Sequence, residues 1–178
     1  MVLWQKPRIN IVNNIQDYWT SLNEHYIAHA LRLGKNRLVV SAVICSQNKV
    51  LVVRRSKEDT YPGLWEFPGG GVDDVNGESV VQACRRESLE ETGIDLPLFP
   101  SGEILVHPTR TALRVVLRFD LDDLPQISLS DEHDEARFLD LDEAKLTQVE
   151  GVIIHDSMRP ENQGVMNLLF GNSMGNDS

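Results

Sequence analysis

Cysteine is rare in this sequence, and long apolar runs are missing from it. The two cysteines, Cys45 and Cys84, lie in apolar segments without metal-ligand spacing, so we expect buried free thiols in a reducing compartment. No stretch approaches the roughly 20 apolar residues that cross a bilayer. Residues 1–14 contain no hydrophobic region typical of a signal peptide. A cytoplasmic protein without a membrane partner is therefore expected.

Positive charge is also scarce. The chain has 17 Lys and Arg against 27 Asp and Glu, which gives a formal net charge of −10. Nucleic-acid polymers bind mainly through Lys and Arg, so we expect no such polymer as a partner. A small anionic substrate is compatible with this charge if cations screen the site. Acidity alone more often reflects only solubility.

The chain contains no internal repeat or low-complexity block, and its 178 residues suit one domain. Apolar spacing predicts helices over residues 15–33, 78–92 and 161–170, a short helix near Asp142, and strands over 38–45, 50–54, 65–67, 104–106, 113–121 and 136–139. Gln47 and Asn48 would form the first turn. This order predicts an α/β sandwich. We divide the chain into a helical extension (1–34), a main domain (35–170) and a polar tail (171–178).

The second expected helix concentrates negative charge on one face. Glu87, Glu90 and Glu91 stand at positions i, i+3 and i+4, so their carboxylates project in similar directions. Like charges at this spacing destabilise a helix, and the negative end of the helix dipole adds to the conflict. A cation would relieve it, and carboxylate oxygens suit Mg²⁺ or Mn²⁺. The alternative is a solvated acidic face that pairs locally with Arg85 and Arg86.

A glycine run precedes this helix, in Pro68-Gly69-Gly70-Gly71. Glycine backbones can approach a ligand closely and adopt positive φ. Their carbonyl oxygens can bind a hard cation, and their amides can contact phosphate oxygens. Such a run is more often only a turn, but together with the acidic helix it indicates a phosphate and metal site.

The combined pattern resembles the Nudix box of the Nudix hydrolase superfamily. In that box a glycine is followed by five residues, a glutamate, seven residues, and then Arg-Glu, an aliphatic residue, any residue, Glu-Glu, any residue, glycine and an aliphatic residue. Here Glu78 is followed by seven residues and then by Arg86-Glu87-Ser88-Leu89-Glu90-Glu91-Thr92-Gly93-Ile94. The lead-in Leu64-Trp65-Glu66-Phe67-Pro68-Gly69-Gly70 is similar to the family as well.

Two positions depart from the family pattern. Seven residues, instead of five, separate Gly70 from Glu78. The extra length falls in 73–76, a composition typical of turns, so we expect a longer loop. This leaves open whether the Gly70 or the Gly71 carbonyl faces the metal. Ser88 occupies a usually aliphatic, core-facing position, and we expect its hydroxyl to bond a backbone carbonyl one turn back.

The resemblance implies a Nudix-type α/β/α sandwich with a mixed central sheet. It also implies a Mg²⁺- or Mn²⁺-dependent hydrolase of a phosphoanhydride (pyrophosphate) bond in a nucleoside diphosphate-linked or nucleoside triphosphate substrate. The implied metal ligands are Glu87, Glu90, Glu91 and a carbonyl of Gly70 or Gly71. Glu78 would support the site and Arg86 would orient the carboxylates. The alternative for Arg86 is a pair with a surface acid.

The general base is open between two residues. Members of the family use either a box glutamate or a glutamate from a distant loop. Here residues 130–135 precede the last expected strand, and Glu132 and Glu135 are the candidates in that loop. The alternative is a solvated acidic loop. We expect His133 to be a surface residue and not a catalyst.

The substrate is less well specified than the chemistry. The lead-in from Trp65 is similar to the branch of the family that acts on oxidised nucleoside triphosphates. Arg54, Arg55 and Lys57 could meet phosphates, although a basic cluster at a strand end is usually solvated. Trp65 could stack on a base, although an aromatic residue before a turn more often packs in the core. A small phosphate compound or nucleotide is the expected partner.

Two further possibilities concern other classes of function. A calcium loop is excluded, because counting from Gly77 puts Val72 and Ala83 at positions that require Asp and Glu. A catalytically silent Nudix-fold domain, which binds a nucleotide or a protein, is the alternative to an enzyme. The presence of all three box carboxylates favours catalysis, because a binding domain has no need to tolerate their repulsion.

The helix expected over residues 15–33 lies outside the family's core. It would either cap the sheet or offer a homodimer surface through Tyr18, Trp19 and Tyr26.

Overall fold

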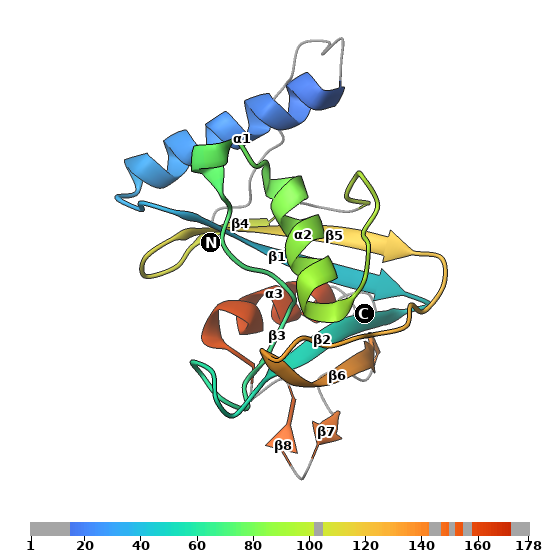
Figure 1. The fold of residues 1–178 in the computed structure, drawn as a ribbon. Helices are drawn as coiled ribbons and strands as arrows, with labels where there is room; N and C mark the ends of the chain where they lie inside the picture. Colours follow the sequence, from blue (N-terminus) through green and yellow to red (C-terminus); the bar gives the residue numbers. More distant parts are fainter. Residues whose placement is uncertain (1–14, 102–104, 143–146, 150–151, 155–157, 172–178) are drawn as a thin grey trace, which may run out of the picture.

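The computed structural model describes residues 15–101, 105–142, 147–149, 152–154 and 158–171 (Figure 1). Its elements are α1 (Ile15–Arg32), β1 (Leu38–Ser46), β2 (Lys49–Arg55), β3 (Trp65–Glu66), η1 (Asp74–Asn76), α2 (Val80–Thr92), β4 (Leu105–Pro108), β5 (Leu113–Leu121), β6 (His133–Asp140), β7 (Gln148–Val149), β8 (Val152–Ile153) and α3 (Pro160–Gly171). Among the described helices, none has the length and apolar character needed to cross a bilayer.

A mixed sheet forms the centre of the fold, as the sequence predicts. Its strands follow the order β3-β2-β1-β5-β4, and β6 also pairs with β2. β1 and β5 are parallel, with Leu38 opposite Leu113 and Ser46 opposite Leu121. The other pairs of this sheet are antiparallel. β7 and β8 form a separate two-stranded sheet that the sequence did not predict.

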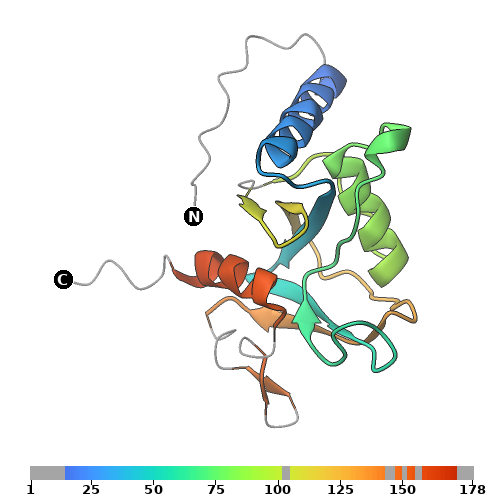
Figure 2. The ribbon, with the colours of Figure 1, turned by 90° about the vertical axis from the view of Figure 1, so that its left-hand side faces the viewer.

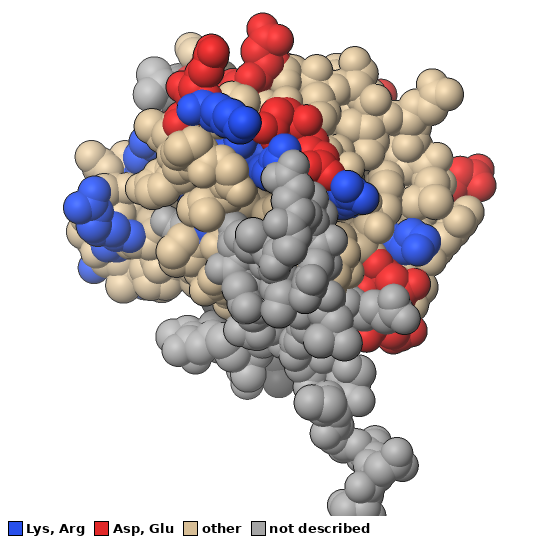
Figure 3. Space-filling model, turned by 90° about the horizontal axis from the view of Figure 1, so that it is seen from below, with Lys and Arg blue, Asp and Glu red and all other residues tan. Residues whose placement is uncertain are grey.

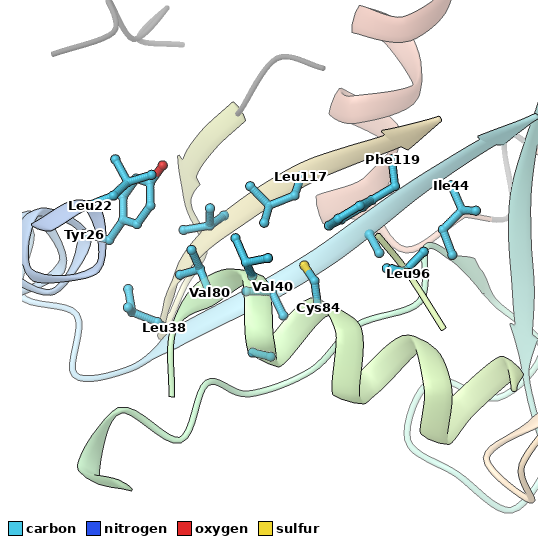
Figure 4. Packing of buried hydrophobic residues seen from close by; sticks show 14 of the residues in the cluster. Leu22, Tyr26, Leu38, Val40, Ile44, Val80, Cys84, Leu96, Leu117 and Phe119 are labelled. Carbon is cyan, nitrogen blue, oxygen red and sulfur yellow. The ribbon is translucent and has the colours of Figure 1, made fainter. Parts of the chain in front are cut away.

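Helices cover both faces of the sheet, with α1 and α2 on one side and α3 on the other (Figures 1 and 2). Side chains alternate along β1, so that Val40 and Ile44 join the α2 side while Val43 and Cys45 join the α3 side. Figure 4 shows the first of these cores, between α1, α2 and the strands. The predicted α/β/α sandwich is therefore confirmed.

The turn between β1 and β2 contains the two residues expected there. Gln47 and Asn48 have φ values of 48° and 61°. Two successive positive φ values are typical of the tight turns that match the twist of a hairpin. They bring Ser46 opposite Lys49.

Away from this turn, β1 separates from β2 and bonds instead to the glycine run. The Ala42 amide donates to the Pro68 carbonyl at 2.8 Å, and the Val40 amide donates to the Gly70 carbonyl at 2.8 Å. β2 pairs instead with β3 and β6. The glycine run after β3 therefore lies alongside the N-terminal half of β1.

α1 packs into the same core as α2 and is integrated into the fold. Leu22, Tyr26 and Ala30 are all buried in that core. The prediction that Tyr26 offers a dimer surface is wrong, because only 1% of the residue is exposed. The side chains of Tyr18 and Trp19 lie outside the part of the structure that is described.

Several element boundaries differ from the predictions. α2 begins at Val80, because the Ser79 side chain caps it and forms a capping box with Gln82. β6 begins at His133, three residues before the expected start at 136, because the strand continues to pair with β2 across a bulge. The helix expected near Asp142 falls on residues 143–146, outside the described ranges, and Asp142 itself lies in a turn.

Candidate functional site

The glycine run is fixed against β1 by a close backbone approach. Gly69 has a φ of +154°, and a Cβ atom there would lie 2.2 Å from the Val40 carbonyl oxygen. Only glycine fits this position without moving the strand. The run therefore presents its backbone to α2 at a defined place.

Glu87 of α2 lies directly against this run. A Cβ atom on Gly70 would be 2.4 Å from Glu87 Oε1, so the carboxylate occupies the space that a side chain would fill. Burial raises the pKa of Glu87 even though Arg86 donates to it, and the charge of Glu90 acts in the same direction. The carboxyl group of Glu87, which ionises less readily than usual, thus lies directly against the backbone of Gly70.

Glu91, one turn along α2, is held by the same run. The Gly69 amide donates to Glu91 Oε2 at 2.9 Å, and only 5% of Glu91 is exposed. Burial raises the pKa of Glu91 to about 9, against the lowering effect of the Gly69 amide. The charges of Glu66, Glu87 and Glu132 raise it further. Several carboxyl groups therefore crowd this point, and their simultaneous ionisation is disfavoured.

Arg86 links the helix to the loop that precedes it. Its guanidinium donates to Glu78 Oε1 at 2.8 Å, to Glu87 Oε1 at 2.8 Å and to the Gly71 carbonyl at 2.9 Å. It also reaches Glu90 Oε2 at 3.1 Å. Arg86 therefore contacts three carboxylates at once, and its predicted role of orienting them remains a prediction.

The lengthened loop before Glu78 closes on itself. Residues Asp74–Asn76 form the 3₁₀ turn η1, and the Asp73 side chain accepts from the Asn76 amide. The Asp73 amide in turn donates to Glu78 Oε2 at 2.8 Å. The prediction of a longer loop is confirmed, because the extra residues project as a turn and leave the contact between Glu78 and Arg86 intact.

The three helix carboxylates are divided between two donors. Glu91 accepts from the Gly69 amide, whereas Glu87 and Glu90 both accept from Arg86. Within the described ranges, no three His, Cys, Asp or Glu side chains converge closely enough to hold one metal ion. Repulsion between like charges accounts for this, since each carboxylate turns to the nearest donor.

A distant loop brings a fourth carboxylate to the site. The Ser128 amide donates to the Thr92 carbonyl at 2.8 Å, and the Ser130 amide donates to the Glu91 carbonyl at 3.1 Å. These bonds fasten the loop to the C-terminal end of α2. Glu132, at the end of the loop, contributes to the raised pKa values of both Glu87 and Glu91. Its charge therefore acts on both carboxyl groups.

The site combines a glycine run that contacts two helix glutamates with a carboxylate from a distant loop. A family model covers the sequence that forms it. The model of the NUDIX domain matches residues 35–157, which is more than half of the chain. The chain belongs to the Nudix family.

Similar proteins extend this assignment. An 8-oxo-dGTP diphosphatase of Proteus vulgaris is 41% identical over 66 residues, which are 36% of this chain and 57% of that protein. The chain thus aligns with little more than half the length of that curated relative.

Solved structures support the Nudix fold. A MutT protein from Methanosarcina mazei Go1 has a TM-score of 0.59 at 23% identity, over 79% of this chain and 96% of that one. A bifunctional NMN adenylyltransferase/ADP ribose pyrophosphatase from Francisella tularensis, complexed with AMP and a Mn ion, has a TM-score of 0.58 at 22% identity. That match covers 88% of this chain and 48% of the other. At these identities the likeness concerns the fold alone.

The second candidate base of this Nudix domain has a different environment. Glu135 Oε2 lies 3.1 Å from Arg54 Nη1, and Glu135 Oε1 lies 2.6 Å from Arg137 Nη2. Arg54 is also paired with Asp134 at 2.6 Å. Both Glu135 and the substrate-binding candidate Arg54 are thus engaged in ion pairs along β2 and β6.

A buried ionic network joins β2, β3, β6 and the residue before α3. The sequence did not predict it. Glu66, which is 3% exposed, accepts from Arg55 Nη1 at 2.6 Å and from Arg159 Nη1 at 2.7 Å. The Nε2 atom of His133 lies 3.3 Å from the same carboxylate. Burial alone would raise the pKa of Glu66, but these partners lower it to about 2. The four residues are far apart in the sequence, so spacing gave no signal for the network.

Two predictions about individual side chains are corrected by this network. His133 is 4% exposed and is not a surface residue, because it turns inward to Glu66. Arg55 is not a solvated strand-end charge, since it bonds Glu66, Asp59 and the Thr60 carbonyl.

Trp65 and Ser88 are also buried. Trp65 is 3% exposed and packs in the core on the α3 side, with Arg54 5.8 Å from its ring centroid. In this position the ring packs in the core and is not presented to a base. The Ser88 hydroxyl donates forward to the Ile94 carbonyl at 3.1 Å, so the expected bond one turn back is wrong. Thr92 makes that backward bond instead, to the Ser88 carbonyl.

The two glycine carbonyls considered as metal ligands already accept hydrogen bonds. The Gly70 carbonyl accepts from the Val40 amide, and the Gly71 carbonyl accepts from Arg86. For Gly69, no hydrogen bond to the carbonyl is found within the part of the chain that is described. The spacing of the box, counted from Gly70, could not reveal this difference.

Proposed function

We propose that the chain is a divalent-metal-dependent hydrolase that cleaves a phosphoanhydride bond of a nucleotide. The observation that carries this proposal is the pair Glu87 and Glu91, which lie against the glycine run with raised pKa values. The burial of two neighbouring carboxylates lowers the stability of the fold, because both are desolvated and their charges repel each other. Such a cost is typical of functional sites.

The residues present fit Mg²⁺ or Mn²⁺. All side-chain donors are carboxylate oxygens, which hard divalent cations prefer. Glu87 and Glu91 would hold the cation, with Glu90 as a third carboxylate. For the backbone ligand we favour Gly69 over Gly70 and Gly71, whose carbonyls already accept hydrogen bonds.

The chain's own residues would then carry out the hydrolysis. Glu132 would take a proton from the attacking water. The water oxygen would form a bond to phosphorus, and the bond from phosphorus to the bridging oxygen would break. The leaving phosphate keeps the electron pair of that bond. Arg86 would position Glu87 and Glu90 through its hydrogen bonds. A bound divalent cation would neutralise charge that develops on the phosphate oxygens.

A small nucleotide is the proposed substrate class. The relative from Proteus vulgaris is named for an oxidised nucleoside triphosphate, and the structure from Francisella tularensis for ADP ribose. On the face seen in Figure 3, Lys and Arg side chains are interspersed with Asp and Glu. This mixture does not favour a nucleic-acid polymer as a partner.

The compartment and the oligomeric state remain proposals as well. Cys45 and Cys84 are both buried and free, which supports a reducing, cytoplasmic compartment. A homodimer stays a prediction, and Tyr26 is not available to form it.

A substrate screen tests the proposed function. The full chain is incubated with nucleoside triphosphates, 8-oxo-dGTP, ADP-ribose, dinucleoside polyphosphates and coenzyme A, each with Mg²⁺ and with EDTA. We expect phosphate or pyrophosphate release from at least one compound, with Mg²⁺ only. No turnover of any compound would contradict the proposal and favour the catalytically silent binding domain.

A further inference from the structure

Tyr61, in the loop between β2 and β3, combines a strained backbone with an exposed ring. Its φ of +63° lies in the left-handed region, which a bulky side chain rarely adopts. The residue is nevertheless 54% exposed. Strained residues of this kind persist where the surrounding structure fixes them, and they concentrate at ligand sites.

The Tyr61 ring is supported on one face by a cation. The Arg159 guanidinium carbon lies 4.9 Å from the ring centroid. Arg159 is itself fixed, because its Nη1 donates to Glu66 Oε2 at 2.7 Å and its amide donates to the Trp65 carbonyl at 2.8 Å. The ring therefore rests on a residue that is bonded to β3.

Hydrogen bonds also fix the backbone next to Tyr61. Arg55 Nε donates to the Thr60 carbonyl at 2.7 Å, and the Gly63 amide donates to the Arg55 carbonyl at 3.0 Å. The Leu64 amide donates to the Tyr61 carbonyl at 3.3 Å. The loop is thus fastened to the end of β2 and keeps the ring in a fixed place.

The contacts lead from this ring to the proposed metal site. Glu66 binds both Arg55 and Arg159, and its charge raises the pKa of Glu91. Three residues after Glu66 the chain reaches Gly69, whose amide binds Glu91. Tyr61 is therefore connected to the site through the Arg159–Glu66 pair and the short segment from Glu66 to Gly69.

We propose that Tyr61, supported by Arg159, is the platform on which the base of the nucleotide substrate stacks. This inference rests on the proposed function and adds a specificity-determining residue to it. An aromatic ring accepts any planar base, so the platform would favour nucleotides over base-free polyphosphates without choosing strongly between bases. It also supplies the stacking surface that was expected at Trp65, which is buried.

Three variants of the full chain separate stacking from structure. Tyr61→Gly removes the ring and also the strain, since glycine adopts this φ freely. The relief of strain offsets the lost ring contact and the added chain entropy, so the Tm of this variant should stay close to that of the parent. Tyr61→Phe keeps the ring. Phe99→Ala removes an aromatic residue that is 43% exposed elsewhere on the surface and serves as the control.

The measurement is kcat and KM for the best nucleotide of the screen and for inorganic tripolyphosphate, both with Mg²⁺. In Tyr61→Gly we expect KM for the nucleotide to rise about ten-fold or more, as is typical for loss of one stacked base. The ratio of kcat/KM for the nucleotide to that for tripolyphosphate should fall by a similar factor. Tyr61→Phe should keep the parent values of the nucleotide KM and of this ratio. Phe99→Ala should leave both quantities unchanged.

Two results would overturn the platform while the hydrolase assignment stands. One is an unchanged nucleotide KM in Tyr61→Gly. The other is an equal loss on both substrates, which would mean that Tyr61 only supports Arg159 and Glu66. If the parent protein turns over no compound at all, the proposed function fails and the platform fails with it.

Discussion

Glu87 and Glu91 stand one helical turn apart, and each lies against a different glycine of the run. Glu87 fills the space beside Gly70, while Glu91 accepts the Gly69 amide. Glu90, between them in sequence, is more exposed and bonds Arg86. The spacing of the box therefore specifies which residues are present, but the glycine run decides which carboxylates are buried.

Glu132 and Glu135 illustrate how surroundings separate two candidates that are equal in the sequence. Glu132 is exposed and lies within charge interaction of Glu87 and Glu91. Glu135 is held by Arg54 and Arg137. Of these two residues, Glu132 is therefore the base that we propose.

Glu132→Gln should lower kcat by about 100-fold or more, the usual contribution of a general base. Glu135→Gln, the matched control, should change kcat by no more than a few-fold, because its carboxylate already serves an ion pair. Steady-state kinetics on the best nucleotide of the screen would measure both. A larger loss in Glu135→Gln than in Glu132→Gln would reverse the assignment of the base.

At the scale of elements, α1 supports the start of α2, the helix with the box glutamates, which we call the Nudix helix. Asn23 Nδ2 donates to the Glu78 carbonyl at 3.2 Å, and Asn23 Oδ1 accepts from the Val80 amide at 3.3 Å. The Val80 amide is one of the helix donors that lack an intrahelical partner. Ser79 satisfies a different one, the amide of Gln82.

Asn23→Ala should lower the free energy of unfolding by about 1–2 kcal/mol, the usual size for one cap or one to two hydrogen bonds. Glu24→Ala, at the exposed neighbouring position of α1, is the control and should change it by less than about 0.5 kcal/mol. Urea unfolding compares the two variants. Equal stabilities would show that α1 is held by its apolar contacts alone.

Much of the architecture was predictable from apolar spacing. β5 was predicted at its observed bounds, and α1, α2 and α3 within two residues at each end. The short pairing strands β7 and β8 were not, because two-residue strands carry no periodic signal. The observed start of α2 differs from the predicted one by two residues, because Ser79 caps the helix and forms a capping box with Gln82.

The site was predictable only where it is linear in the sequence. Glu78, Arg86, Glu87, Glu90 and Glu91 follow a fixed spacing, and the structure brings Arg86 into contact with Glu78, Glu87 and Glu90. The network around Glu66 joins residues up to 93 positions apart, as between Glu66 and Arg159. Such a network depends on tertiary pairing of β2, β3, β6 and the start of α3, which no local pattern encodes.

At the scale of the whole molecule, pH and metal should act together on stability. The folded-state pKa of Glu91 is raised to about 9 and that of Glu87 is also raised. A carboxyl group with a raised pKa stabilises the fold only while protonated. Its contribution is therefore present below its ordinary pKa near 4.5 and is lost as pH rises toward about 9.

Mg²⁺ should reverse this loss, because a cation binds the ionised carboxylates of the folded state. We expect the rise in Tm on adding Mg²⁺ to be several degrees at pH 9 and smaller at pH 6, where protons compete for the ligands. Glu91→Gln should show a reduced rise at both pH values. Thermal unfolding monitored by circular dichroism measures this, and an equal Mg²⁺ effect in parent and variant would argue against a metal site at Glu91.

The central claim is that the carboxylates of the Nudix helix hold the metal that the hydrolysis requires. It is tested most directly by kcat/KM of the Glu90→Gln/Glu91→Gln double variant on the best nucleotide, over a range of Mg²⁺ concentrations. Both changes keep the side-chain shape, so circular dichroism should show an intact fold. We predict a loss of at least about 100-fold that added Mg²⁺ does not restore. Full activity in the double variant would contradict the account.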